Sequence, residues 1–198
     1  MNLMKIFISA FLINNVVLMR FLALCPFIGM STDEDKSIGM GLAVTFVTVL
    51  ATCVTWPVYR FILEPLGLQF LQLLVFILVI ASLVQLVEFY LKKAAPGLYS
   101  SMGIYLALIT TNCAILAVTL DVINNTCSFT GKPYTFIESI VFAVGVAMGF
   151  LLSLLLLAGI RKRLRTSPVP AFLKGTPVLF VSAALLSLAF MGFSGLVK

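Results

Sequence analysis

The sequence predicts an all-α membrane protein with six transmembrane helices in two inverted repeats of three helices. Of the 198 residues, 62% are hydrophobic and only 10% are charged, whereas soluble domains carry about 25% charged residues. Six apolar runs are long enough to cross a hydrocarbon layer, which takes roughly 20 residues. In the first run of each half, a residue that breaks or caps helices lies beside a cysteine. We therefore expect the first helix of each half to be broken near its cysteine.

The six runs use almost the whole chain, so we expect a single polytopic membrane domain over residues 1–198, with no room for a soluble catalytic domain. A boundary near Ala95-Pro96-Gly97 gives halves of about 1–95 and 96–198. Because each half has three helices, the second half enters the membrane from the opposite side, as in inverted-repeat folds. The runs lie at about 3–30, 37–62, 69–91, 101–120, 134–160 and 173–196.

The first run is expected to remain a spanning segment, because Asn14, Asn15 and Arg20 interrupt it and no small-residue cleavage site follows. The fifth run carries Gly145 and Gly149, a small-xxx-small pair that lets helix backbones approach closely. We expect this pair to serve packing within the chain, with a contact between protein chains as the alternative.

Basic residues predict the topology. Eight lie in the first, third and fifth connections and four on the opposite side. The positive-inside rule then places the odd connections in the cytoplasm and both termini outside. The net charge of +6 follows from this arrangement and does not indicate nucleic-acid binding. The chain has no histidine, which excludes haem ligation by histidine, histidine proton relays and histidine-based zinc catalysis.

Cys25 and Cys113 are the candidate binding residues. Cys25 precedes Pro26, which deprives the backbone of one N–H and favours the first turn of a helix. We expect Cys25 at the cap position of a half-helix that starts at Pro26, with the amide of Phe27 free to point at the sulfur. Asn112, preceded by two threonines, offers a side chain that satisfies the backbone at a second break beside Cys113.

Two half-helix N-termini that converge on one point favour an anionic group, and an iron–sulfur cluster with thiolate ligands is anionic. Arg20 adds a cation that is costly in a membrane without a purpose. A [2Fe–2S] cluster normally takes four protein ligands, so a partner would supply two. The simpler alternative is that both cysteines are small buried hydrophobes. Cys53 is expected to be an ordinary buried cysteine, and Cys127 a free thiol or occasional disulfide partner in the longest connection.

Four segments closely resemble the family of A-type subunits of the Rnf electron-transport complex, and the similarity runs nearly end to end. The E-type protein of the sodium-pumping NADH:quinone oxidoreductase shares the architecture, but its first motif has threonine where this chain has Pro26. The Rnf interpretation is therefore preferred. The segments are FLALCPFIG at 21–29, LITTNCA at 108–114, AGIR at 158–161 and LSLAFMGFSG at 186–195.

The resemblance implies six transmembrane helices in two inverted halves and a homologous partner of opposite orientation, the E-type Rnf subunit. It implies a [2Fe–2S] cluster near the membrane midplane to which each of the two proteins gives two cysteines, here Cys25 and Cys113. Pro26 and Asn112 would shape the breaks, and Arg20 would offset cluster charge. The implied role is an electron relay, not catalytic alone, in a ferredoxin:NAD oxidoreductase that moves Na⁺ or H⁺ across a prokaryotic cytoplasmic membrane with the B-, C-, D- and G-type Rnf subunits.

Two other functions remain open from the residues alone. Broken helices in inverted repeats are also a design of secondary transporters, and Glu88 with Gln85 one turn earlier would then be the candidate ion ligands. A carboxylate near a helix end more often reaches the interface or pairs with Lys92. A purely structural membrane protein is the third possibility, and it predicts that both cysteines tolerate replacement by serine.

Overall fold

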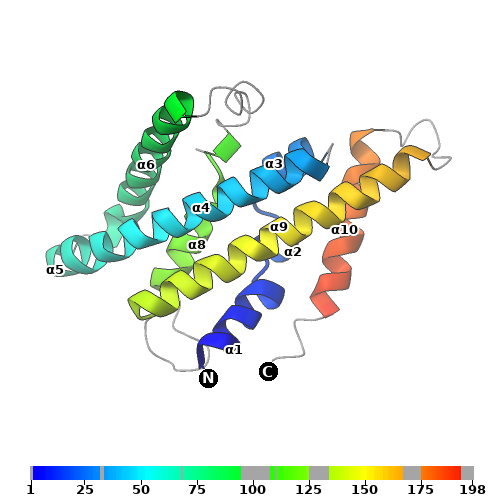
Figure 1. The fold of residues 1–198 in the computed structure, drawn as a ribbon. Helices are drawn as coiled ribbons and strands as arrows, with labels where there is room; N and C mark the ends of the chain where they lie inside the picture. Colours follow the sequence, from blue (N-terminus) through cyan, green and yellow to red (C-terminus); the bar gives the residue numbers. More distant parts are fainter. Residues whose placement is uncertain are drawn as a thin grey trace.

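Three long helices form the frame of the fold in the computed structural model, which describes residues 2–31, 34–67, 69–94, 108–109, 111–124, 134–166 and 175–192 (Figure 1). They are α4 (Glu34–Val58), α6 (Gln72–Ala94) and α9 (Phe136–Thr166). An apolar stretch of membrane-spanning length lies along each: Gln72–Phe89 in α6, Phe136–Leu164 in α9, and Ser37–Leu63, which begins in α4 and continues past its end. The second, third and fifth predicted runs are thus confirmed as long apolar helices.

The first apolar run is divided into three pieces rather than two. Helix α1 (Asn2–Ile8) continues into a π-helical turn (Ser9–Ile13), and then come α2 (Val16–Arg20) and α3 (Leu24–Met30). The chain breaks once at Asn14-Asn15 and again at residues 21–23, just before Cys25. The prediction of a break near this cysteine is confirmed, and the additional break at the asparagines was not expected.

Within the described residues, two shorter helices overlap the fourth and sixth predicted runs. Helix α8 spans Cys113–Asn124 and α10 spans Thr176–Met191. A π-helical turn (Tyr59–Leu63) and the short α5 (Glu64–Leu66) extend α4, and a 3-10 turn (Gln69–Leu71) precedes α6. The start of the fourth predicted run and the boundary between the halves lie outside the described residues.

The core lies between α4 and α9, which run side by side along most of their length (Figure 1). Met40 and Val44 of α4 and Phe150 and Leu154 of α9 are almost completely buried. Helix α8 packs against both long helices, while α6 contacts α4 and α8, and α10 contacts α2 and α9. The two long helices therefore provide the platform on which the shorter, broken segments are fixed.

Gly145 and Gly149 place α9 directly against the first segment. A Cβ atom at Gly145 would lie 2.8 Å from the Cβ of Ala10, and one at Gly149 would lie 2.8 Å from the carbonyl oxygen of Phe11. Real Cβ atoms do not approach their neighbours so closely. The small-xxx-small pair therefore serves packing within the chain, as the sequence predicted.

Gly149→Ala is expected to destabilise the chain by about 1–3 kcal/mol, because the new methyl group meets the rigid backbone of Phe11 and forces α9 away from the first segment. The measurement is the thermal unfolding midpoint of the full chain in detergent. Gly159→Ala is the matched control in the same helix, since a Cβ there meets nothing within 4 Å. Equal midpoints for the two variants would contradict the close approach.

Asn15 also links the first segment to α9 close to Gly149. Its side chain is fully buried. The Oδ1 atom accepts hydrogen bonds from the backbone N–H groups of Val17 (3.3 Å) and Leu18 (3.4 Å), and so caps α2. The Nδ2 atom donates to the carbonyl oxygen of Gly149 (3.0 Å) and to Ser153 Oγ (2.6 Å). One amide thus satisfies a buried helix end and joins two helices.

Candidate functional site

Cys25 is the second residue of α3, and the break that precedes it has an unusual backbone. Phe21 (φ 53°) and Ala23 (φ 58°) both adopt the left-handed conformation, which costs non-glycine residues roughly 1–2 kcal/mol each. The chain turns sharply between α2 and α3 at this point. Because surrounding packing must hold two strained residues in place, the position of Cys25 is set by the tertiary structure and not by local propensity.

The structure corrects the expected start of this half-helix. Helix α3 begins at Leu24 with Ala23 at the cap position, so Cys25 is not the cap and Pro26 is not the first helical residue. The amide of Phe27 donates to the carbonyl oxygen of Ala23 at 3.2 Å and is therefore not free to point at the sulfur. Pro26 fits in this first turn because a residue there has no N–H partner to lose.

Cys113 is the first residue of α8, and Asn112 caps this helix. The Asn112 Oδ1 atom accepts a hydrogen bond from the amide of Ala114 at 3.0 Å. The Asn112 backbone N–H donates to the carbonyl oxygen of Ile109 at 3.3 Å, which closes the turn before the cysteine. The prediction that Asn112 satisfies backbone groups at a second break is confirmed. Thr110 lies outside the described residues.

Both cysteines are free thiols with exposed side chains, whereas Pro26 and Asn112 beside them are buried. The simpler interpretation, in which both cysteines are buried hydrophobes, is wrong for this chain. The chain thus presents two sulfur atoms on its surface, each in the first turn of a helix that follows a backbone break.

Arg20 at the end of α2 is paired with Asp121 of α8. Its Nη1 atom lies 2.8 Å from Asp121 Oδ2 and donates a hydrogen bond of 2.9 Å to Oδ1. The Asp121 side chain is only 14% exposed, so its negative charge is compensated in a largely apolar setting. The pair joins the helix just before the Cys25 break to the helix that begins with Cys113. That Arg20 offsets the charge of a cluster stays a prediction.

Arg161 of α9 holds the far end of α3. Its Nη1 atom donates to the carbonyl oxygen of Ile28 (3.0 Å) and contacts Ser31 Oγ at 3.1 Å. These groups form the C-terminus of α3, where a cation is favourable. Arg161 therefore fixes the end of α3, the short helix that carries Cys25, to the long helix α9. The strained turn at residues 21–23 fixes its start.

The remaining candidate residues are Glu88, Gln85, Cys53 and Cys127. Glu88 on α6 is half-buried and Gln85 is exposed, while the side chain of Lys92 is outside the described residues. Cys53 is half-buried in α4, and Cys127 is outside the described residues. Within the described ranges, no group of three or more histidine, cysteine, aspartate or glutamate side chains gathers where it could hold a metal ion.

The sequence interpretation missed Asp121, and it used Arg161 only for topology and as part of the AGIR segment, with no structural role. An acidic residue inside an apolar run was a usable signal, because a buried carboxylate in a membrane segment requires a partner. Arg161 gave no such signal, since it lies in a basic cluster that the positive-inside rule already explains.

The sequence profile of the family described as "Rnf-Nqr subunit, membrane protein" matches residues 3–197. The chain is 53% identical to the A-type member of the ion-translocating oxidoreductase complex of Syntrophotalea carbinolica over 196 residues, which is 99% of this chain and 98% of that protein. It is 52% identical, with the same coverage, to the A-type member of the Na(+)-translocating ferredoxin:NAD(+) oxidoreductase complex of Acetobacterium woodii. Identity to the corresponding protein of Cereibacter sphaeroides is 50% over 96% of this chain and 95% of that protein.

Proposed function

Because the chain belongs to the Rnf-Nqr family of membrane subunits, we propose that it serves as the A-type subunit of an ion-translocating ferredoxin:NAD oxidoreductase complex. In this role it relays single electrons across the bilayer through a [2Fe–2S] cluster shared with a homologous protein. The names of its relatives support membership of such a complex. The proposed electron relay rests on the exposed thiols of Cys25 and Cys113.

The two thiols fit half of a cluster site. Four thiolates hold a [2Fe–2S] cluster, and thiolate sulfur is a soft ligand that suits iron–sulfur chemistry. Cys25 and Cys113 are both free and both face outward from this chain, where a second protein can reach them. The proposal assigns two ligands to this chain and two to a homologous partner of opposite orientation, the E-type Rnf subunit.

A cluster held by Cys25 and Cys113 together with the partner's ligands would supply one-electron transfer at this site. Cys25 and Cys113 supply the anionic sulfur ligands. Asn112 fixes the first turn of α8 and so the position of the Cys113 sulfur. The Arg20–Asp121 pair and the bond from Arg161 to Ile28 fix the segments that carry the two cysteines. Ligands held in advance by packing and hydrogen bonds keep the geometry of a site constant.

A carrier inside the membrane is useful because the hydrocarbon layer is about 30 Å thick. A relay near mid-depth divides that distance into two shorter electron-transfer steps. In the proposed complex, electrons would come from and pass to carriers on the B-, C-, D- and G-type Rnf subunits. The energy released on electron transfer drives the movement of Na⁺ or H⁺ by the complex, to which this chain contributes without being a catalyst alone.

The order of helices supports an inverted repeat. In each half, a broken apolar segment that carries a cysteine precedes a long helix, α4 in the first half and α9 in the second. We infer that two three-helix halves are related by a pseudo-two-fold axis in the membrane plane. The distribution of basic residues further assigns both termini to the outer side of a prokaryotic cytoplasmic membrane.

The iron content of this chain co-purified with its homologous partner tests the proposal. We expect about two iron atoms and two acid-labile sulfides per pair, because one [2Fe–2S] cluster takes ligands from both chains. The control is this chain expressed alone, which has half of the ligand set and is expected to retain far less iron. An iron-free, colourless pair that supports ion-dependent uptake of a substrate would contradict the relay and favour a transporter.

A further inference from the structure

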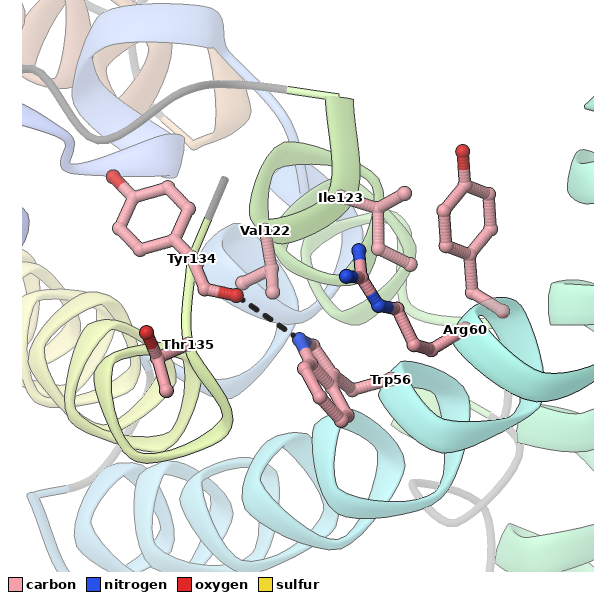
Figure 2. A pocket seen from close by; sticks show the side chains of 7 residues that line it. Trp56, Arg60, Val122, Ile123, Tyr134 and Thr135 are labelled. Carbon is pink, nitrogen blue, oxygen red and sulfur yellow. Dashed lines mark hydrogen bonds between the residues drawn. The ribbon is translucent and has the colours of Figure 1, made fainter. Parts of the chain in front are cut away.

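A cavity of about 270 Å³ lies where the end of α4 meets the end of α8 and the start of α9, and no cysteine is among its described lining residues (Figure 2). It is open on one side and combines aromatic, cationic and aliphatic groups. Its walls include Trp56, Arg60, Val122, Ile123, Tyr134 and Thr135.

The aromatic wall of this cavity is held rigidly. The indole N–H of Trp56 donates to the carbonyl oxygen of Tyr134 at 3.2 Å, as the dashed line in Figure 2 shows. The Trp56 ring also packs edge-on against Phe136, and the Tyr134 ring packs against Phe142, each at a centroid distance of 5.4 Å. The cavity is therefore formed before any ligand binds, which lowers the entropic cost of binding.

Arg60 supplies the positive charge of the cavity. Its guanidinium group extends toward Ile123 and above Trp56 (Figure 2). It also forms a salt bridge to Glu64, with Nη1 and Oε2 3.3 Å apart, but the two side chains are 52% and 47% exposed. Such an exposed pair is weak, and a guanidinium has five N–H donors. Arg60 therefore keeps donors for a second anion.

The cavity lies near the ends of two apolar stretches of membrane-spanning length, which is where the boundary between hydrocarbon and water is expected. The apolar stretch of α4 ends at Leu63, and that of α9 begins at Phe136. Tryptophan and tyrosine concentrate at the membrane interface of membrane proteins, and an arginine guanidinium matches the geometry of a phosphate group. Val122 and Ile123 give the cavity an aliphatic wall beside the cation.

We propose that this cavity binds the headgroup of an anionic phospholipid. A phosphate oxygen accepts hydrogen bonds from Arg60, and the first carbon atoms of the lipid contact Val122 and Ile123. The volume of about 270 Å³ is slightly below that of pockets for drug-sized ligands, roughly 300–1,000 Å³, which suits a headgroup while the acyl chains remain in the membrane. This site does not depend on the proposed electron relay.

The test is retention of lipid by the detergent-purified, delipidated complex, measured by native mass spectrometry after addition of dioleoyl phosphatidylglycerol, dioleoyl phosphatidylcholine or inorganic phosphate. We expect phosphatidylglycerol to be retained in preference to the other two. Arg60→Gln is expected to weaken its retention about tenfold, the factor for one charge-assisted hydrogen bond. Arg163→Gln removes an arginine from the exposed end of α9 and is expected to leave retention unchanged.

A further variant separates lipid binding from the local salt bridge. Glu64→Gln abolishes the same ion pair as Arg60→Gln but keeps the guanidinium, so it should retain phosphatidylglycerol at least as well as the unmodified complex. The proposal is overturned if Arg60→Gln retains phosphatidylglycerol normally, or if phosphatidylcholine or inorganic phosphate is held equally well. It is also overturned if a density map of the complex shows Arg60 paired with a carboxylate of another protein of the complex and no lipid in the cavity.

Discussion

Replacement of Cys25 or Cys113 by serine is expected to remove the native [2Fe–2S] EPR signal of the complex co-expressed with the homologous partner. Each substitution deletes one of four sulfur ligands and puts a harder oxygen, a poorer ligand for iron–sulfur clusters, in its place. Electron transfer through the complex should fall with the signal. EPR of the reduced complex and its iron content are the measurements.

Cys53→Ser is the matched control for these variants. Cys53 is a free, half-buried cysteine within α4, and the proposal gives it no ligand role, so its replacement should leave the signal unchanged. An unchanged signal in Cys25→Ser or Cys113→Ser would reject the ligand assignment. Loss of the signal in all three variants would point to damage of the fold.

Asn15→Ala is expected to destabilise the chain by about 2–4 kcal/mol. The substitution leaves the amides of Val17 and Leu18 without their cap in a buried position and removes both bonds to α9. Water cannot replace these partners in an apolar interior. The thermal unfolding midpoint of the full chain in detergent is the measurement.

Two further variants, Asn14→Ala and Asn15→Ser, separate the contribution of the Asn15 oxygen from that of its amide nitrogen. Asn14→Ala makes the same change one residue earlier, at a half-buried side chain, and is expected to have a small effect. Asn15→Ser keeps an oxygen that can cap α2 but cannot bridge to α9, so its midpoint should lie between those of Asn15→Ala and the unmodified chain. A midpoint for Asn15→Ala equal to that of Asn14→Ala would refute the account of this contact.

Local signals in the sequence predicted the parts of the structure that local chemistry determines. Long apolar runs gave α4, α6 and α9, because only a helix satisfies its own backbone in hydrocarbon. Asn112 was predicted to satisfy the backbone beside Cys113, and its Oδ1 atom does so. The resemblance to a known family pointed to the same two cysteines, which the structure places on the surface.

The backbone break before Cys25 could not be predicted in detail from local sequence signals. Phe21 and Ala23 adopt left-handed conformations for which their residue types have no preference, since glycine and asparagine dominate that region. Tertiary contacts impose this turn: Asn15 anchors the start of α2, and Arg20 anchors its end to Asp121. The start of α3 therefore could not be read from Pro26 alone.

The Arg20–Asp121 pair was also beyond local reasoning. The two residues are 101 positions apart, and only the packing of α2 on α8 brings them together. Each residue alone signals an unusual charge in an apolar run, but neither identifies its partner. The same holds for Arg161, whose bond to the end of α3 spans 133 positions.

An experimental density map of the assembled complex tests the central claim most directly. The account predicts that the Sγ atoms of Cys25 and Cys113 are both bonded to iron of one [2Fe–2S] cluster, with the other two ligands from the homologous protein of opposite orientation. A map in which either sulfur faces lipid, or in which the two side chains lie far apart with no iron between them, would contradict it.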